Sequence, residues 1–238
     1  MDTVSTEFEP SPSTPTLPRM LYERLRGSIL VGTLQAGQVL RQEELARSFN
    51  VSRVPLREAL SQLEADGLIE SRPRRGYAVT ALDQAEIVEV FDLRMLIEEH
   101  AGRIAALSRT PADVVEVEKL VVVMEQLDPK APDYRSRWTL LNYEFHLRII
   151  ECTRRKRLSR IAGTLRSTVE PYVSVEIDLT GNAEAAAREH REMLEALRAG
   201  DAAGLAELSR QHVESTARRL LKGLRSKAAA ENLLGSIK

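Results

Sequence analysis

The stretch from Asn50 to Thr80 constrains the fold of this chain more than any other part of it. It reads NVSRVPLREALSQLEADGLIESRPRRGYAVT. Apolar residues recur there at helical spacing and predict one buried face, made of Leu56, Ala59, Leu60 and Leu63. Arg53 and Arg57 are four residues apart and therefore share another face. We expect a short amphipathic helix that carries two cations on its exposed side.

The ends of this helix are also marked in the sequence. Ser52 is a good N-cap, and its hydroxyl is expected to accept a hydrogen bond from an amide of the first turn. Pro55 falls in that first turn, where a missing N–H is tolerated. Gly67 ends the helix. The helix is therefore expected to start just after Ser52 and to end before Gly67.

The flanking segments complete a recognisable layout. A second short amphipathic helix precedes this one at residues 43–49, and Asn50 lies in the turn between them. Two short alternating strands follow at residues 68–71 and 77–80, around a basic loop. A lone pair of arginines on a helix is usually a solvated face. The agreement of cap, turn, helices and basic hairpin instead favours a winged helix-turn-helix, which places a helix in the DNA major groove.

Residues 21–79, from LYERLRGSIL to RRGYAV, resemble the N-terminal domain of GntR-family bacterial transcription regulators, most specifically at VSRVPLREAL and LEADGLI. The rest resembles the all-helical FCD domain of the FadR subfamily, and the two resemblances together cover roughly residues 19–225. Many relatives carry an arginine where this chain has Glu43, and whether Arg41 replaces it is left open. The predicted DNA-binding residues are Arg41, Ser52, Arg53, Arg57, Arg72, Arg74, Arg75 and Gly76.

Composition supports DNA binding by a local patch only. The chain has 238 residues, enough for two modest domains, and a net charge of −1, which excludes wholesale polyanion binding. Residues 19–82 nevertheless contain ten Arg against seven Asp and Glu, a surplus of three positive charges. DNA affinity is therefore expected to depend on salt.

Cysteine usage and the lack of targeting patterns indicate the compartment. Cys152 is the single cysteine of the sequence, so no intrachain disulfide can form, which fits a reducing environment. The N-terminal segment has no basic-then-apolar signal pattern. The longest aliphatic stretch, residues 120–124, is far too short to span a bilayer. We expect a cytoplasmic protein that does not insert into a membrane.

The expected fold class is mainly α. Residues 1–18 are predicted to be a disordered tail, residues 19–82 the winged helix-turn-helix with a small β-hairpin wing, and residues 83–225 an all-helical bundle for effector binding and dimerisation. Residues 226–238 are predicted to be a frayed tail. Pro171 is expected to kink or divide a long helix at residues 158–179.

Three of the four histidines have a spacing that indicates a metal site. His190 and His212 each lie eleven residues from Asp201, the centre of a helix–helix turn, so they are level on two antiparallel helices. His146 lies on an earlier helix, with Asn142 one turn before it. These residues are able to hold one divalent metal, although helical histidines are more often surface or core residues.

The resemblance implies more about this site. FCD domains bind zinc or a similar metal through Asp-x-x-x-His and two later histidines, and Asn142, His146, His190 and His212 match that order. Asn142 replaces the usual Asp; its amide oxygen is able to ligate but brings no charge. The resemblance implies zinc, with nickel or manganese open, and does not include His100. Arg94 matches an arginine that holds anionic effectors in relatives; a salt bridge to Glu98 is the alternative.

The sequence therefore predicts a homodimeric transcription regulator rather than an enzyme. A small effector, expected to be a carboxylate, would bind beside the metal and change affinity for a near-palindromic operator in double-stranded DNA. One alternative is a DNA-binding dimer with a vestigial or metal-free effector pocket. A second is an enzyme whose metal activates water, but no carboxylate is obviously placed as its general base apart from Glu144, which points off the face of Asn142 and His146.

Overall fold

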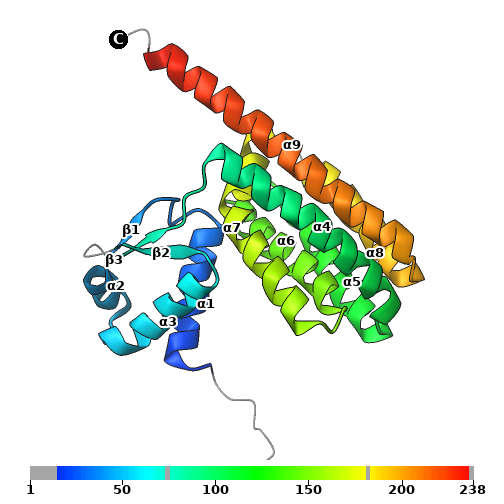
Figure 1. Cartoon of the computed structure of the whole chain (residues 1–238), viewed down its shortest axis with the longest axis horizontal. Helices are drawn as coiled ribbons and strands as arrows, with labels where there is room; N and C mark the ends of the chain where they lie inside the picture. The colour runs from blue at the N-terminus through cyan, green and yellow to red at the C-terminus, as the bar shows by residue number, and fades with distance from the viewer. Residues whose placement is uncertain (1–14, 73–75, 181–182, 236–238) are drawn as a thin grey trace, which may run out of the picture.

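We describe the protein from a computed structural model, over residues 15–72, 76–180 and 183–235. The chain forms a small N-terminal head, which holds every described strand, and a larger bundle of long helices (Figure 1). The mainly α fold predicted from the sequence is confirmed, as are the winged head and the helical C-terminal part.

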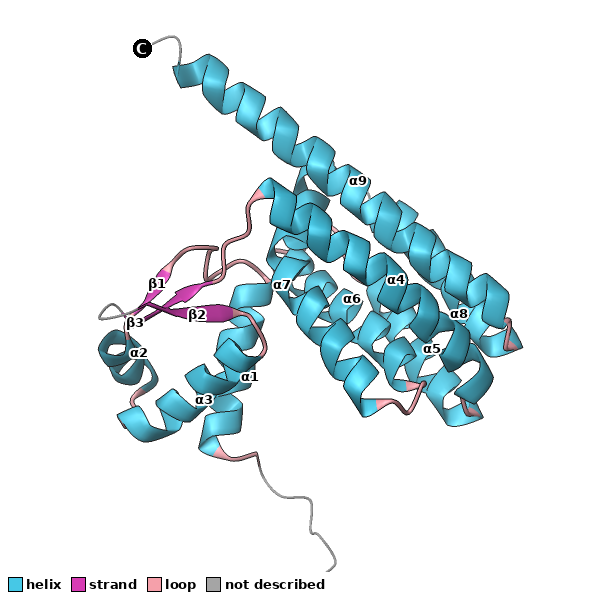
Figure 2. Ribbon diagram, in the orientation of Figure 1, coloured by secondary structure: helices cyan, strands magenta, loops and turns pink. Residues whose placement is uncertain are grey.

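The head packs three helices against a small antiparallel sheet (Figure 2). The elements are α1 (Leu17–Leu30), β1 (Val39–Leu40), α2 (Gln42–Phe49), α3 (Arg53–Ala65), β2 (Ile69–Arg72) and β3 (Gly76–Val79). The strand order is β1-β3-β2, with Val39 opposite Ala78 and Arg72 opposite Gly76. The core is aliphatic, and Leu56, Leu60 and Leu63 are completely buried in it. The apolar face predicted for α3 is therefore the face that packs.

One detail of α3 corrects the sequence analysis. Ser52 occupies the N-cap position with extended backbone angles, but its hydroxyl makes no capping hydrogen bond. A capping hydroxyl normally accepts from the second or third amide of the helix. Pro55 is the third residue of α3 and has no N–H, so one of those two donors is missing. Asn50 takes the left-handed conformation expected of it, with φ 53°.

The helical domain is a bundle in which α4 lies along α9 and α6 packs on α7 (Figure 1). Its helices are α4 (Gln84–Ser108), α5 (Pro111–Glu125), α6 (Tyr134–Glu151), α7 (Lys156–Thr180), α8 (Ala183–Ala199) and α9 (Ala202–Gly235). Capping boxes begin α4, at Asp83 and Glu86, and α5, at Thr110 and Asp113.

Two helices are longer than the sequence analysis expected. Pro171 lies inside α7 without dividing it, because one missing N–H leaves the neighbouring turns able to continue the helix. The last helix, α9, runs to Gly235, so the described part of the frayed tail predicted at residues 226–238 is helical. Residues 224–234 contain no Gly or Pro and several strong helix formers, which explains the continuation.

The head contacts the bundle through α1, which packs on α6 and α7. The guanidinium of Arg26 lies 4.2 Å from the centre of the Tyr143 ring, a cation–π distance. The Tyr143 hydroxyl in turn lies 3.0 Å from the hydroxyl of Ser167 on α7. A second link is the Leu82 N–H, which donates to the hydroxyl of Tyr172 at 2.6 Å. The junction is therefore made of specific contacts from both parts.

Candidate functional site

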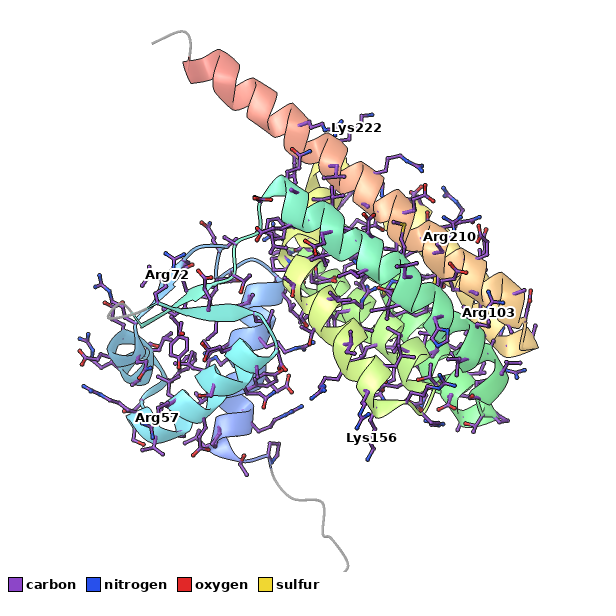
Figure 3. All side chains as sticks on the ribbon, in the orientation of Figure 1. Arg57, Arg72, Arg103, Lys156, Arg210 and Lys222 are labelled. Carbon is purple, nitrogen blue, oxygen red and sulfur yellow. The ribbon has the colours of Figure 1, made fainter. Side chains whose placement is uncertain are left out.

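The exposed side of α3 presents Arg53, Val54 and Arg57, and Figure 3 shows Arg57 pointing away from the body of the head. Arg53 donates a hydrogen bond to Glu43 on α2 at 2.8 Å. Both of these side chains remain about 70% exposed, so solvent or a ligand reaches them. The predicted pair of cations on one accessible helix face is present.

A groove lies beside this face, where α2, the start of α3 and β3 meet. Its lining includes Arg41, Arg53 and Gly76, three residues predicted for DNA binding. Gly76 has φ 83°, and a Cβ there would approach the Leu40 carbonyl oxygen to 3.1 Å, so a larger residue would be strained. Sequence reasoning missed Arg47, which lines the same groove; its spacing of four residues from Glu43 was the available signal.

Apart from Arg57, the remaining described residues predicted for DNA binding are Ser52 and Arg72. Ser52 and Arg53 line an adjoining hollow at the turn between α2 and α3. Arg72 ends strand β2 and pairs with Glu70 at 3.0 Å. Arg74 and Arg75 lie outside the described residues. The described part of the head therefore gathers its candidate DNA-binding arginines around α3 and the wing.

A second site lies inside the bundle, where His146 of α6, His190 of α8 and His212 of α9 meet. One potential ligand atom from each histidine lies within 4.8 Å of those of the other two, and all three side chains are buried. Tertiary packing thus brings together the three histidines that the sequence predicted. His100, which the motif excluded, is exposed on α4.

Two of these histidines, His146 and His190, are held in the neutral form that binds metal ions. Burial, followed by the positive charge of Arg166, holds the pKa of His146 well below its usual value. Burial, followed by the charge of His212, does the same for the pKa of His190. The Nε2 atoms of His146 and His190 are buried and have no hydrogen-bond partner in the described chain. A neutral imidazole with a free nitrogen is the form that ligates a cation.

The third histidine has a carboxylate partner on its other side. His212 Nδ1 lies 2.6 Å from Glu189 Oε2, which leaves Nε2 as the remaining ring nitrogen. Burial works against ionisation of Glu189, but the hydrogen bond and charge of His212 hold its pKa below the ordinary value. Carboxylates often orient metal-bound histidines in this way. Sequence analysis missed Glu189, although its spacing next to His190 placed it on the same helix.

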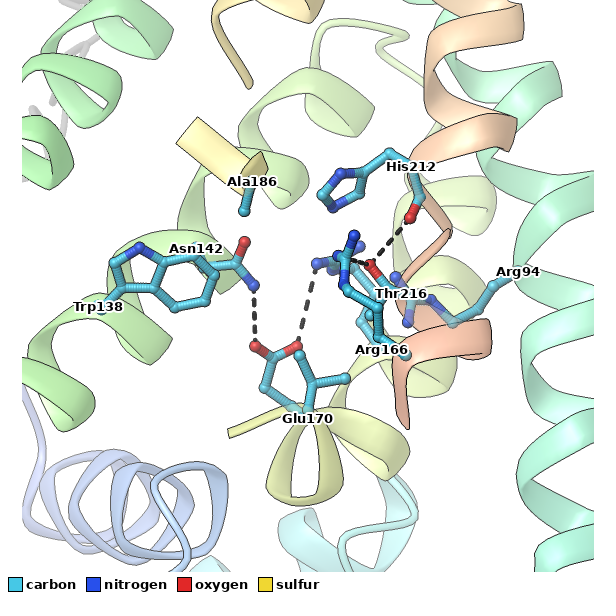
Figure 4. Close-up of a pocket in the computed structure, with 10 residues that line it drawn as sticks. Arg94, Trp138, Asn142, Arg166, Glu170, Ala186, His212 and Thr216 are labelled. Atoms are coloured by element: carbon cyan, nitrogen blue, oxygen red, sulfur yellow. Dashed lines mark hydrogen bonds and ion pairs between the residues drawn. The ribbon is translucent and has the colours of Figure 1, made fainter. Parts of the chain in front are cut away.

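A small polar cavity adjoins the histidines (Figure 4). Arg94, Trp138, Asn142, Arg166, Glu170, His212 and Thr216 are among the residues that line it. About 20 Å³ is open to the centres of water-sized molecules, which is room for about one water. Any ligand of several heavy atoms has to displace side chains to enter.

The salt bridge of Arg94 to Glu98, which the sequence offered as the alternative to effector binding, is present. Arg94 lines the cavity, and its Nε donates to Glu98 at 2.8 Å. Glu98 accepts from Arg166 at 2.9 Å as well. Burial disfavours the charged carboxylate, but Arg166 and Arg94 hold the pKa of Glu98 below its usual value. The result is a buried Arg–Glu–Arg cluster on the wall of the cavity. Arg166 and Glu170 were missed because nothing in a single helix indicates burial of their charges.

The geometry defines a class of protein before any comparison is made. A helix with exposed arginines follows a short helix and a left-handed turn, and a two-stranded wing completes a winged helix-turn-helix. An all-helical domain with a polar interior is joined to it. This combination is typical of DNA-binding regulators with a sensory domain.

Comparisons with known proteins agree with this class. The family described as "Bacterial regulatory proteins, gntR family" matches residues 17–79, and the FCD domain matches residues 89–215. The chain is 30% identical over 207 residues to the HTH-type transcriptional repressor GlaR of Escherichia coli, covering 81% of this chain and 90% of the relative. It is 27% identical over 218 residues to the repressor RspR of E. coli, covering 89% and 91%.

Among solved structures, E. coli McbR/YncC superimposes with a TM-score of 0.77 at 21% identity, covering 88% of this chain and 99% of that one. That likeness concerns the fold. The two domain matches and the relatives together show that the chain belongs to the GntR family of bacterial transcription regulators, with the FCD domain of the FadR-like branch. Both of these relatives are named as transcriptional repressors and not as enzymes. No described helix is long and apolar enough to cross a membrane.

Proposed function

We propose that this regulator changes its affinity for operator DNA when a small carboxylate binds beside a divalent metal in the helical domain. The observation that carries the proposal is the group of three buried histidines, two of which have unpartnered Nε2 atoms, next to a cavity that contains Arg94. Unpartnered buried polar atoms cost free energy, so a site that keeps them is well suited to a ligand.

The metal would be held by His146, His190 and His212, with Asn142 or water completing the shell. Three imidazole nitrogens on separate helices suit zinc, and nickel or manganese are the alternatives. When bound, such an ion supplies a Lewis-acid centre with open positions for an anion. Its binding would also tie α6, α8 and α9 together and stabilise the fold by mass action.

The effector would lie in the polar cavity with its carboxylate near the arginines. A guanidinium suits bidentate contact with a carboxylate, and Arg94 Nη1 is buried with no hydrogen-bond partner in the described chain. Because the cavity holds only about one water, entry of an effector would displace lining side chains and would thereby shift the helices that carry them. An effector that binds only the shifted conformation would favour that conformation over the other, and an effector response requires such a difference in affinity.

Helix α6 offers a short route from this cavity to the head. Trp138 and Asn142 line the cavity from α6, and Tyr143, the residue after Asn142, packs with the core of the head. A movement of α6 would therefore alter the Arg26–Tyr143 contact at the same time. Effector binding would change the placement of the two heads of a dimer and so their fit to the operator.

DNA binding itself would use Arg53 and Arg57 on base edges or flanking phosphates, with Ser52, Arg41, Gly76 and the wing arginines around them. The protein would act in the cytoplasm as a homodimer, joined through residues 83–225, on a near-palindromic operator. Two-fold protein symmetry is matched by two-fold sites, and a single winged head buries little surface.

Metal content and thermal stability test the metal centre. Protein purified without chelator is expected to contain about one divalent metal per chain, and His190→Ala and His212→Ala are expected to lose it. Adding zinc to apo protein should raise the unfolding temperature of the parent but not of these variants. His100→Ala is the matched control and should behave as the parent. A metal-free parent with no thermal shift on zinc, nickel or manganese would favour the vestigial pocket instead.

The oligomeric state and the effector response need separate measurements. Analytical ultracentrifugation at micromolar concentration is expected to give a dimer, and a monomer with and without DNA would overturn that part. A panel of small carboxylates should shift the affinity for a duplex selected by the protein from a random library. Loss of the metal should weaken that response more than it weakens DNA binding in the absence of effector.

A further inference from the structure

A buried amide–carboxylate pair lies at the edge of the histidine cluster. Asn142 on α6 is 3% exposed and Glu170 on α7 is 1% exposed. The side-chain amide of Asn142 donates to Glu170 Oε1 at 3.1 Å. An ionised carboxylate only accepts hydrogen bonds, so it binds the NH₂ end of the amide and turns the carbonyl end away.

The carbonyl end of that amide has no hydrogen bond of its own. Asn142 Oδ1 is buried, and no hydrogen-bond partner for it exists in the described chain. Figure 4 shows this oxygen on the side of the amide away from Glu170, toward Ala186 and His212. Asn142 also lies one helical turn before His146 on α6. The unpartnered oxygen is therefore aimed into the cavity beside the histidines.

Glu170 is itself incompletely paired. Its Oε2 atom is buried without a hydrogen bond in the described chain, and Arg166 approaches it only to 3.9 Å. Arg166 uses its Nη1 atom on Glu98 instead, at 2.9 Å. A buried carboxylate with so loose a partner is costly unless a further positive charge lies near it.

We propose that Glu170 is a positioning residue for the metal centre. It holds Asn142 with Oδ1 toward His146, His190 and His212, and it supplies from α7 the negative charge that an aspartate at position 142 would supply directly. This role accounts for both buried oxygens that have no hydrogen bond in the described chain, Asn142 Oδ1 and Glu170 Oε2. The inference rests on the proposed metal centre and adds a residue from α7, a helix that contributes no histidine to it.

The first test removes the charge without changing the size of the side chain. In Glu170→Gln the amide of residue 170 is able to donate or accept, so it no longer fixes the orientation of Asn142. Zinc affinity, measured by competition with a chromophoric chelator, is expected to fall about 10–100-fold, as for other residues that orient metal ligands. Glu99→Gln, a carboxylate on α4 whose side chain is 35% exposed, is the matched control and should bind zinc as the parent does.

The second test exchanges the two groups. Asn142→Asp alone places two carboxylates in hydrogen-bond contact and should destabilise the apo protein toward heat. In the double variant Asn142→Asp/Glu170→Gln, the glutamine donates to the new aspartate, so the pair is re-formed with the charge on α6. Zinc affinity should return to within about tenfold of the parent, the lower limit of the loss expected from such residues.

The outcomes separate this inference from the metal proposal itself. A parent that binds no zinc overturns the metal centre and this role together. A parent that binds zinc while Glu170→Gln binds it equally well overturns only the role of Glu170. A purely structural pair would change the unfolding temperature of the apo protein and leave zinc affinity unchanged. If Glu170→Gln does not fold, the double variant decides, and more than tenfold weaker zinc binding there overturns the inference.

Discussion

The head carries its charged side chains on the exterior, whereas the helical domain also buries polar and charged side chains in its interior. In the described head, the buried side chains are apolar apart from the hydroxyl of Tyr22, and its arginines are largely exposed. Among the described residues of the helical domain, fourteen polar or charged side chains are buried between residues 94 and 216. The head is therefore arranged to meet a large charged partner from outside, whereas the bundle is arranged to enclose something small.

The two arrangements of charge differ in what they cost the free energy of folding. Exposed cations on the head keep their hydration until DNA replaces it, so they cost the fold little. The buried Arg94–Glu98–Arg166 cluster has lost its hydration and depends on mutual pairing. Substitutions of charge should therefore damage binding in the head and folding in the bundle.

The largest expected effect is on the buried cluster. Glu98→Ala leaves two buried guanidinium groups without their shared carboxylate and should destabilise the helical domain by about 3–5 kcal/mol. Urea unfolding followed by circular dichroism measures this. Glu99→Ala, which removes a surface partner of Arg103 on the same helix, should cost about 0–1 kcal/mol. Similar losses for the two variants would contradict the contrast between interior and surface.

The next effect concerns the recognition helix. Arg57→Ala should weaken operator binding by about 1–3 kcal/mol if the guanidinium makes a bidentate guanine contact, and should leave the unfolding midpoint unchanged. The double variant with Arg53→Ala should lose more. Fluorescence anisotropy with a selected duplex gives the affinity. Arg103→Ala, an exposed arginine of the bundle (Figure 3), is the control. An unchanged titration for the double variant would exclude α3 as the reading helix.

A smaller effect is expected at the wing. Arg72 ends β2 and is expected to act on the DNA backbone, so Arg72→Ala should lower the slope of log affinity against log salt by about 1. The affinity loss should be nearly the same for selected and scrambled duplexes. Lys156→Ala, on the bundle (Figure 3), should leave the slope unchanged. A loss confined to the selected duplex would assign base reading to the wing instead.

The smallest effect tests the apolar part of the bundle interior. Burial, followed by the negative charge of Asp113, raises the pKa of Cys152 to about 11. At pH 8 roughly one thiol in a thousand would be ionised, so the native protein should react very slowly with a disulfide reagent. Its reaction should speed up as the pH rises toward 11 and on unfolding in urea. Rapid labelling of native protein at pH 8 would show that this interior opens easily.

Much of the head was readable from local sequence. The spacing of Leu56, Leu60 and Leu63 predicted the buried face of α3, and Asn50 predicted the turn before it, because these signals act within a few residues. The Ser52 cap failed for an equally local reason, since Pro55 removed a donor. The length of α9 was underestimated because residues 226–238 were predicted to be a frayed tail, although residues 224–234 favour a helix.

In the interior of the bundle, less of the site could be predicted from the sequence. The sequence by itself determined that His190 and His212 are level across a hairpin, because helical rise per residue is constant. It offered His146, with Asn142 one turn before it, as a ligand from a third helix, and the family resemblance pointed to the same residues. Only the tertiary structure decided that Glu170, Arg166 and Glu98 are buried beside them. A carboxylate on a helix looks the same in sequence whether it faces water or the core, and the packing of α4, α6, α7 and α9 determines which charges lose their water.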